Sequence, residues 1–532
     1  MARVTPLDTA RSRRGGRRDA AGGGRSAPRG GVTPLTLALD PSASESLQRQ
    51  LYVALRSAIL EGRLAPRVRL PGTRSLAESL EVSRTTVALV FDQLRAEGYV
   101  QGRERSGTFV ADVLPDAHVG VQGGEVRRVR APRVRDEPGA DLSRRGALLS
   151  SLVVTSTPLG RQSGARAFRL GTPALDHFPL QLWGRLLARR WRGMSAARLS
   201  YAEPHGEPQL REAIAAYVGQ ARAVRCEAGQ VIVVSGAQQA FDLVARVLLD
   251  PGDAAAVEDP GYRGTRAALE AAGATLVPIP VDREGMDVGA LRGLVRAPRL
   301  VCVTPSHQFP LGVTLSAARR LALLDWARAG GGWIVEDDFD SEYRFRGRPL
   351  PSLQGMAPAS RVIYVGTFSK TLFPALRLGY LIVPEALVEP FARARATVDR
   401  QPAALEQVVL AEFIAEGHFA RHVRRMRALY AERQATLLQL LGGAASAWLE
   451  AESVDAGMHL VGWLRRGMDD AGVAQRLLEA GVVASPLRAL SLVPGPRGAL
   501  LLGFAAFDRA TMERALATMC TVLGREPWRA AR

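Results

Sequence analysis

Lysine is almost absent from this chain of 532 residues. Lys370 is the only lysine, so every other basic side chain among the 70 lysines and arginines belongs to arginine. Arginine serves surface charge, ion pairs and phosphate contacts, but a guanidinium stays protonated and does not attack an aldehyde. The one retained amine therefore indicates imine chemistry at Lys370. The alternative is that a single lysine survived by chance in a composition biased toward arginine.

Cysteine is also scarce, and long apolar runs are missing. The three cysteines, Cys226, Cys302 and Cys520, lie far apart and form no pair with the spacing of metal ligands, which indicates reduced thiols in a cytoplasmic protein without a metal site. No run approaches the length of a membrane span. The N-terminal residues are rich in arginine and glycine and lack the apolar segment of a secretory signal. We therefore expect no membrane contact.

The positive charge is unevenly distributed. The net charge is +18; residues 1–33 hold eight arginines against two acids, a net of +6, and residues 114–165 hold eight arginines against five acids, a net of +3. Neither segment has an apolar period, so we expect a disordered basic tail over residues 1–33 and a long linker over residues 114–167. Basic arms commonly meet nucleic acid, although a solvated tail explains the charge equally well.

Residues 44–113 have the pattern of a helix-turn-helix followed by a wing. Leu47, Leu51, Leu55 and Ile59 repeat every four residues, a short helix follows, and Ser83 then caps a third helix. After that helix come two short apolar stretches separated by a glycine turn, which predicts a two-stranded wing. The alternative is a plain three-helix subdomain that packs on its neighbour.

The detailed motif favours the first interpretation. Leu70-Pro71-Gly72-Thr73-Arg74-Ser75-Leu76-Ala77, Val82-Ser83-Arg84-Thr85-Thr86-Val87 and Ser106-Gly107-Thr108-Phe109-Val110 resemble the GntR-type winged helix. The resemblance implies that double-stranded operator DNA is contacted by Arg74, Arg84, Thr85, Thr86 and Gly107. Two positions depart from the pattern: Gly72 replaces a usual serine, and Glu81 replaces a usual turn glycine. We expect some strain in the turn at Glu81.

From Phe168 the chain alternates strands and helices, which is typical of an α/β domain. The apolar stretch Val231–Val234 leads into Ser235-Gly236-Ala237-Gln238 and a helix. A strand, a small-residue turn and a helix N-terminus form an anion site, because free backbone N–H groups and the helix dipole face the anion. Such turns are common, so this signal is weak by itself.

Three acids end a later apolar strand, at Glu336, Asp337 and Asp338. A carboxylate beside a pyridinium nitrogen keeps that nitrogen protonated and strengthens the ring as an electron sink. Strand alternation puts Asp337 and Phe339 on one face and the other two acids on the opposite face. We favour Asp337 as the partner of such a ring, with Asp338 second. The alternative is a solvated carboxylate cluster.

The surroundings of Lys370 suit a phosphorylated aldehyde. Thr367 and Ser369 precede the lysine and Arg377 follows it, and hydroxyls with a guanidinium are what a phosphate needs. The stretch from Tyr364 to Tyr380 resembles the cofactor-lysine motif of fold-type I aminotransferases. Residues 168–525 resemble that fold throughout, with a smaller C-terminal α+β portion.

The combination of the two domains resembles the MocR/GabR/PdxR group of bacterial transcriptional regulators. The resemblance implies pyridoxal 5'-phosphate as the cofactor, held covalently by Lys370, with Asp337 at the ring nitrogen and Tyr262 stacked on the ring. It also implies a head-to-tail homodimer, in which Tyr201 reaches the cofactor phosphate of the partner chain. The phosphate would be held by Ser235, Gly236, Gln238, Ser369 and Arg377.

Two departures bear on function. Phe339 stands where the group usually has a tyrosine that binds the cofactor's phenolic oxygen, and Leu501 stands where amino-acid-binding members keep an arginine for the substrate carboxylate. Arg488 or Arg497 would have to substitute for that arginine. We therefore expect a regulator of vitamin B6 metabolism that senses the cofactor, with at most weak transaminase activity. The alternatives are a working aminotransferase and a regulator that senses an amino acid or 4-aminobutyrate.

Overall fold

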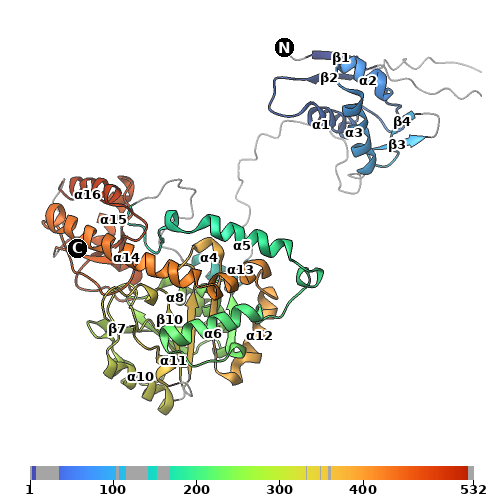
Figure 1. Ribbon diagram of the computed structural model, residues 1–532. Helices are drawn as coiled ribbons and strands as arrows, with labels where there is room; N and C mark the ends of the chain where they lie inside the picture. Colours follow the sequence, from blue (N-terminus) through green and yellow to red (C-terminus); the bar gives the residue numbers. More distant parts are fainter. Residues whose placement is uncertain are drawn as a thin grey trace, which may run out of the picture. The chain divides into compact units, whose positions relative to one another are not determined.

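The chain divides into two units, residues Met1–Ala140 and Asp141–Arg532 (Figure 1). The computed structural model describes residues 3–7, 35–103, 107–114, 142–152, 167–330, 332–347, 349–357, 361–465 and 467–524. Most of the expected basic tail and linker, and the tip of the expected wing at residues 104–106, lie outside these ranges.

The N-terminal unit is a winged helix, as the sequence predicts. Its apolar helix faces meet in one core that includes Leu51, Leu55 and Phe91, each at most 2% exposed. Strands β3 and β4 pair antiparallel and form the wing. The elements are β1 (Arg3–Leu7), β2 (Leu35–Leu39), α1 (Leu47–Leu60), α2 (Thr73–Leu80), α3 (Arg84–Ala96), β3 (Val100–Arg103) and β4 (Gly107–Val110).

Two expectations for the flanking segments are wrong in part. The disorder expected over residues 1–33 does not extend to residues 3–7, which form β1 and pair antiparallel with β2. The β-branched pair Val4-Thr5 favours this conformation. The side chains of Leu37 and Leu39 on β2 are buried in the winged-helix core, so the folded part begins before residue 44.

The segment expected to be a linker also contains a helix, α4 (Arg144–Ser151). The Ser143 side chain accepts a hydrogen bond from the backbone N–H of Gly146, which caps the first turn. None of its side chains is buried. Because α4 has no apolar stripe, the capping residue Ser143 was the only feature of the sequence that could have predicted this helix.

The turn between α2 and α3 is strained, as expected. Glu81 ends α2 with φ 51° and ψ 41°, in the left-handed region. That conformation brings the Cβ atom of a non-glycine residue close to the following carbonyl oxygen. Glycine avoids this cost because it has no Cβ atom.

The C-terminal unit is built on an eight-stranded sheet with the order β5-β12-β11-β10-β9-β6-β7-β8. The neighbouring strands β7, β6, β9, β10 and β11 are parallel, whereas β12 runs antiparallel to β11 and to β5. These strands are β5 (Val231–Val234), β6 (Ala254–Asp259), β7 (Thr275–Asp282), β8 (Gly285–Met286), β9 (Leu300–Val303), β10 (Trp333–Asp338), β11 (Val362–Thr367) and β12 (Gly379–Ile382).

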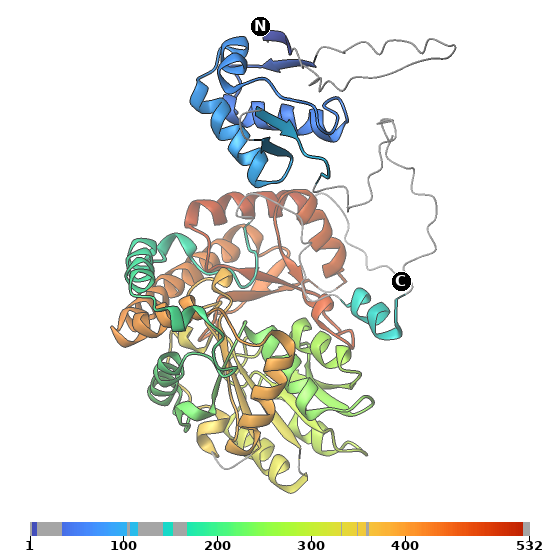
Figure 2. The same cartoon turned by 90° about the vertical axis from the view of Figure 1, so that its right-hand side faces the viewer.

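Helices cover both faces of this sheet (Figure 2). Alternate residues of one strand face opposite layers: Val231 and Val233 pack with α5, α6 and α13, while Ile232 and Val234 pack with α7 and α12. Buried parallel strands require cover on both faces. The helices of this part are α5 (Leu180–Arg192), α6 (Pro208–Arg222), α7 (Ala237–Leu248), α8 (Arg263–Ala271), α9 (Val288–Arg292), α10 (Ala317–Gly330), α11 (Leu353–Met356), α12 (Glu385–Asp399) and α13 (Ala404–Ala415).

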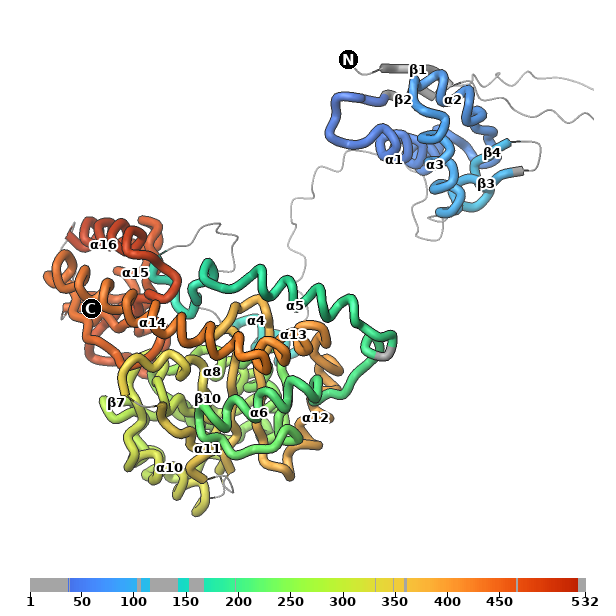
Figure 3. The backbone as a smooth tube through the Cα atoms, viewed as in Figure 1, coloured from blue at the N-terminus to red at the C-terminus, as the bar shows by residue number. Residues whose placement is uncertain are grey.

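The long helix α14 (His418–Leu440) joins this layer to the smaller C-terminal part, as the backbone trace shows (Figure 3). Phe419 and Val423 near its start belong to the core of the large sheet, and Tyr430 and Leu437 belong to the C-terminal core. One helix therefore ties the two parts together. None of the described helices is long and apolar enough to cross a membrane.

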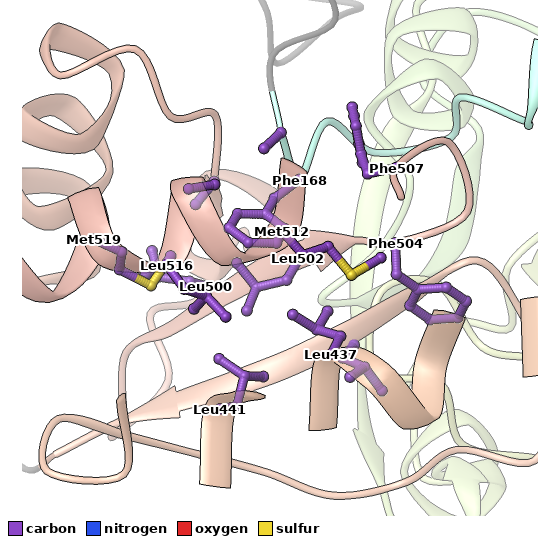
Figure 4. Close-up of a cluster of buried hydrophobic side chains, with 14 of the residues drawn as sticks. Phe168, Leu437, Leu441, Leu500, Leu502, Phe504, Phe507, Met512, Leu516 and Met519 are labelled. Carbon is purple, nitrogen blue, oxygen red and sulfur yellow. The ribbon is translucent and has the colours of Figure 1, made fainter. Parts of the chain in front are cut away.

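The C-terminal part is a four-stranded sheet, in the order β13-β14-β16-β15, covered by helices. Leu500 and Leu502 face the main core together with Phe504 and Met512 (Figure 4), whereas Leu501 faces a separate apolar cluster. This is the alternation that a strand imposes. The elements are β13 (Leu449–Ala451), β14 (His459–Leu464), α15 (Asp470–Glu479), β15 (Ser485–Pro486), β16 (Ala499–Gly503) and α16 (Arg509–Leu523).

Replacing Glu81 with glycine tests the strain in the helix-turn-helix. We expect Glu81→Gly to stabilise the winged helix by about 0.5–1 kcal/mol, because glycine adopts a positive φ without a Cβ clash. All seven tryptophans lie in the C-terminal unit, so the readout is hydrogen exchange of the α2 and α3 amides. Glu61→Gly is the matched control, since Glu61 ends α1 at φ −77°; it should lose stability. If Glu81→Gly and Glu61→Gly changed the stability of the winged helix by the same amount, the backbone at Glu81 would not be strained.

Candidate cofactor site and DNA-binding surface

The residues singled out in the sequence gather at the carboxyl ends of the parallel strands. Ser235 follows β5, Tyr262 follows β6, Asp337 lies near the end of β10, and Lys370 follows β11. Loops at this edge are where open α/β sheets bind ligands. The topology therefore brings together positions that are separated by as much as 135 residues in the sequence, from Ser235 to Lys370.

The amine of Lys370 is held by a backbone carbonyl. Its Nζ atom donates a hydrogen bond to the oxygen of Gly171 at 3.1 Å. Gly171 has φ +65°, and a Cβ atom there would lie 2.4 Å from Nζ, so a larger residue would displace the amine from this position. Burial lowers the pKa of Lys370, and the carboxylates of Asp340 and Asp337 act in the opposite direction. A lowered pKa makes the amine a better nucleophile. No pattern in the sequence had pointed to Gly171.

The three acids of β10 have different partners. Glu336 accepts hydrogen bonds from the N–H groups of Leu353 and Gln354 at the start of α11. Asp338 forms a buried ion pair with Arg222 at 2.6 Å and also accepts a hydrogen bond from Tyr364. These two acids therefore have structural roles.

Asp337 is the one of these three acids for which no hydrogen bond or ion pair is found within the described part of the chain. It is 8% exposed, and its Oδ1 atom is buried without a hydrogen bond. Burial, reinforced by the neighbouring acids Asp338, Glu258 and Asp340, raises the pKa of Asp337 to about 8, while Lys370 acts in the opposite direction. A buried carboxylate of this kind is strongly stabilised by a cationic partner.

A second group of residues surrounds Arg377. Its Nη2 atom donates to the carbonyl oxygen of Ser235 at 2.5 Å. Gly236 caps α7 with φ +95°, and a Cβ atom there would lie 3.1 Å from the Arg377 guanidinium. The first turn of α7 and an exposed guanidinium thus lie side by side, which is suited to an anion.

Three further candidates lie around this group. Gln238 donates from Nε2 to the oxygen of Gly264 at 3.0 Å, and its Oε1 atom is buried without a partner. Tyr262 is 37% exposed and packs edge-on against Phe309 with ring centroids 6.0 Å apart. The N–H of Ser369 donates to the hydroxyl of Thr367 at 3.2 Å.

Tyr201 lies on an exposed stretch. Its side chain is 74% exposed, and the guanidinium of Arg400 lies 4.0 Å from its ring centroid. Leu180, Trp191 and Leu199 in the same segment are 71%, 59% and 67% exposed. Large apolar side chains gathered on a surface are typical of an interaction site.

His307 is a buried group to which the sequence patterns assigned no role. Its Nδ1 atom lies 2.9 Å from Oδ1 of Asp340, and its Nε2 atom is buried without a partner. A Cβ atom on Gly457 would lie 2.0 Å from the imidazole, so this glycine makes room for the ring. In the sequence His307 lies in the stretch from Thr304 to Pro310, which resembles the regulator group but by itself gives the histidine no task.

Leu501, where amino-acid-binding members of the group have an arginine, lies in apolar surroundings. Leu501 is 0% exposed and packs in a cluster that includes Phe309. Arg488 is oriented toward Asp469 at 3.5 Å, and Arg497 pairs with Glu450 at 2.9 Å and lies over the ring of Trp463. Both candidate substitutes are therefore engaged in other contacts.

The winged helix exposes the residues that the resemblance implied. Arg84 and Thr85 open α3 and are exposed, and Arg74 is exposed on α2, where it pairs with Glu78 at 3.1 Å. Thr86 is half-buried and shares a 2.8 Å hydrogen bond with the cap residue Ser83. Gly107 begins β4 with φ +102°, which only glycine adopts easily.

Among the described residues, no cluster of acids, histidines and cysteines could hold a metal ion. The site instead offers a free amine, an unpaired buried carboxylate and an anion-binding turn. Together these fit a phosphorylated aldehyde with a basic ring nitrogen.

Comparisons with known proteins agree with both units. Residues 168–519 match the family Aminotransferase class I and II, and residues 47–110 match the gntR family of bacterial regulatory proteins. Among solved structures, the α-aminoadipate aminotransferase LysN of Thermus thermophilus, complexed with N-(5'-phosphopyridoxyl)-L-leucine, superposes with a TM-score of 0.63. It is 29% identical, and the match covers 68% of this chain and 92% of that one.

Relatives with both units are regulators. The probable rhizopine catabolism regulatory protein MocR of Rhizobium meliloti is 43% identical over 90% of this chain and 94% of its own length. The pyridoxine biosynthesis transcriptional regulator PdxR of Corynebacterium glutamicum is 31% identical, and the match covers 91% of this chain and 98% of PdxR. The HTH-type transcriptional regulator TauR of Rhodobacter capsulatus is 36% identical, and the match covers 85% of this chain and 90% of TauR.

A DNA-binding winged helix joined to an aminotransferase-type domain defines a transcriptional regulator with an enzyme-like second unit. The chain belongs to the MocR-type family of these regulators.

The unpaired Asp337 makes the stability of the cofactor-free protein depend on pH. Its pKa of about 8 in the folded state exceeds the usual value of 3.8, so between these pH values the folded state binds more protons than the unfolded chain. The free energy of unfolding therefore falls as the pH rises from about 4 to about 8. We expect Asp337→Asn to remove part of this loss, on the order of a few kcal/mol.

The measurement is urea unfolding of cofactor-free protein, followed by tryptophan fluorescence at pH 6 and pH 8. Burial raises the pKa values of Glu258 and Glu336 to about 7 as well, so a smaller dependence in the same direction remains in the variant. Identical pH dependence in Asp337→Asn and the wild type would mean that Asp337 is ionised in the folded protein.

Proposed function

We propose that the C-terminal unit binds pyridoxal 5'-phosphate at Lys370 and reports its occupancy to the DNA-binding unit. The observation that carries this proposal is the one lysine amine of the chain, held by Gly171 in the same strand-end region as the unpaired Asp337. When bound, the cofactor supplies an aldehyde for the amine and a ring nitrogen for a carboxylate. The phosphopyridoxyl compound in the related LysN structure supports the choice of cofactor.

Each residue has a proposed task that follows from its position. Asp337 keeps a ring nitrogen protonated, Tyr262 offers an aromatic face, and Arg377 neutralises a phosphate. The remaining phosphate contacts are Ser235, Gly236, Gln238 and Ser369. Asp338 is not available for the ring nitrogen, because Arg222 and Tyr364 already bind it.

The exposed segment at residues 180–201 supports a homodimer. Four large side chains there are between 59% and 74% exposed, which is costly for a surface without a partner. We propose that this segment meets a second copy of the chain and that Tyr201 reaches the partner's phosphate site. A symmetric pair would present two winged helices to two DNA half-sites. DNA binding also implies a cytoplasmic location.

The regulated process that fits best is vitamin B6 metabolism, with the cofactor itself as the effector. An α-amino acid brings a carboxylate that needs a cationic partner, and burial of an unpaired carboxylate costs several kcal/mol. Leu501 gives this region an apolar surface, and Arg488 and Arg497 are engaged elsewhere. The likeness to PdxR supports the same conclusion. Efficient transamination is disfavoured for the same reason, as is the sensing of an amino acid or 4-aminobutyrate.

The DNA-binding surface can be tested by replacing one arginine on α3 and, as a control, one arginine elsewhere in the same unit. Arg84→Ala should weaken binding to an operator, selected from random duplexes by the wild-type protein, by about 1–3 kcal/mol if the side chain reads a base. Arg63→Ala is the control, since Arg63 is an exposed arginine of the same unit that pairs with Glu61 at 2.7 Å. Fluorescence anisotropy at fixed salt measures both. If both variants keep wild-type affinity, α3 does not dock as proposed.

The effector can be tested by titrating cofactor-free protein on the same labelled operator. We expect pyridoxal 5'-phosphate alone to change the operator affinity and to colour the protein yellow. Amino acids and 4-aminobutyrate should then leave both the visible spectrum and the DNA affinity unchanged. A spectral shift at submillimolar amino acid, together with altered DNA affinity, would overturn the vitamin B6 assignment in favour of an amino-acid sensor.

Lys370→Ala provides the control for this titration, and Lys370→Arg keeps the charge. Borohydride reduction should fix one cofactor per chain in the wild type and none at this position in either variant. Peptide mass spectrometry locates the label. A variant that retains a reduced cofactor in the C-terminal unit would contradict the role of Lys370, because the chain has no second lysine.

A further inference from the structure

A pocket of about 250 Å³ opens in the C-terminal unit, and the function proposed above does not use it. Its walls come from the end of α6, from the segment that follows β10, and from the first half of α14. None of its lining residues is among those proposed to hold the cofactor. The pocket is therefore a separate feature of this unit.

The charges around the pocket are unbalanced. Four arginines line it, at positions 222, 344, 424 and 427, against the single carboxylate of Glu342. Arg222 is neutralised by Asp338 at 2.6 Å, and Arg344 lies 3.7 Å from Asp455. Two arginines thus remain to supply positive charge.

These two arginines, Arg424 and Arg427, lie three residues apart on α14, so they project from one side of the helix. No ion pair with either of them is present within the described ranges of the chain. Arg427 donates from Nε to the backbone oxygen of Glu342 at 2.9 Å, which anchors its guanidinium at the pocket. The terminal nitrogens of both side chains are then available for a ligand.

Neutral polar groups complete the lining. The hydroxyl of Tyr217 donates to Oε1 of Glu342 at 2.9 Å, and the Oγ atom of Ser341 is buried without a partner. Two guanidinium groups beside an unsatisfied hydroxyl match the donors that a carboxylate or phosphate group requires. The volume is just below the usual range of about 300–1,000 Å³ for drug-sized ligands, so the ligand is a small molecule.

We propose that this pocket is a second ligand site of the regulator, which binds a small metabolite carrying a carboxylate or phosphate group through Arg424 and Arg427. The site is independent of Lys370. Its lining, however, includes the buried Arg222, whose partner Asp338 adjoins Asp337 on β10. The ion pair between Arg222 and Asp338 therefore connects the pocket to β10, the strand that carries Asp337, the proposed partner of the cofactor ring.

The pocket has a built-in pH dependence. Burial, followed by the charge of Asp338, raises the pKa of Glu342 to about 7. The hydrogen bond from Tyr217 and the charge of Arg222 favour the ionised form of Glu342, whereas a bound anion favours its protonated form. Anion binding therefore takes up a proton at Glu342, and the affinity should fall several-fold between pH 6 and pH 8.

Sulfate is a suitable probe because its charge does not change over this range. Calorimetric titration of full-length, cofactor-saturated protein with sulfate, against chloride at equal ionic strength, should show one saturable site per chain. Arg424→Gln and Arg427→Gln should each weaken binding by about tenfold or more. Arg328→Gln is the control, since Arg328 is an exposed arginine that pairs with Asp325; it should bind as the wild type does.

Two further measurements complete the test. In Lys370→Ala protein, Arg424→Gln and Arg427→Gln should weaken the same sulfate site as in the wild-type background, which separates this site from the cofactor site and from its proposed function; any additional sulfate bound at the vacated turn of Gly236 and Arg377 should be unaffected by these two substitutions. Citrate and glycerol 3-phosphate then identify the ligand chemistry, since the tighter binder shows whether carboxylate or phosphate is preferred. The absence of saturable binding, or equal binding by the two glutamine variants and the wild type, would overturn the proposal.

Discussion

The buried ion pair between Arg222 and Asp338 organises the C-terminal unit. It joins the end of α6 to the end of β10, and Arg222 also donates to Ser306 after β9 while Tyr364 of β11 donates to Asp338. Removing one partner of such a pair leaves an uncompensated buried charge, which commonly costs about 3–5 kcal/mol. Because the pair occupies Asp338, the neighbouring carboxylate of Asp337 is the one left for a ligand. The same Arg222 also lines the pocket that contains Arg424 and Arg427.

The C-terminal unit combines a rigid scaffold with unsatisfied polar groups. Its central strands are buried, yet Oδ1 of Asp337, Oε1 of Gln238 and Nε2 of His307 are all buried without partners. Folding alone does not favour such groups, because each loses its hydrogen bonds to water. These three groups lie near the strand ends, and a ligand bound there, as proposed above, would restore the missing interactions.

The sequence predicted the winged helix and the aminotransferase-type sheet because both depend on local signals. Capping serines, apolar periods and the small-residue turn at Ser235-Gly236 each act within a few residues. The strand β1 was missed because its pairing partner lies about thirty residues away, beyond a stretch of arginine and glycine. The helix α4 was missed because it buries no side chain, so no apolar stripe marked it.

The sequence by itself determined that Lys370 is the one lysine, that acids end β10, and that position 501 is a leucine and not an arginine. Only the tertiary structure decided which of the three acids lacks a hydrogen bond, which carbonyl binds the Lys370 amine, and which pocket Arg424 and Arg427 of α14 line. The physical reason is that these outcomes depend on contacts between distant segments: Arg222 and Asp338 are 116 positions apart, and Lys370 and Gly171 are 199. The sequence gives the type of each side chain directly, whereas the partner of that side chain depends on which distant segments the tertiary fold brings together.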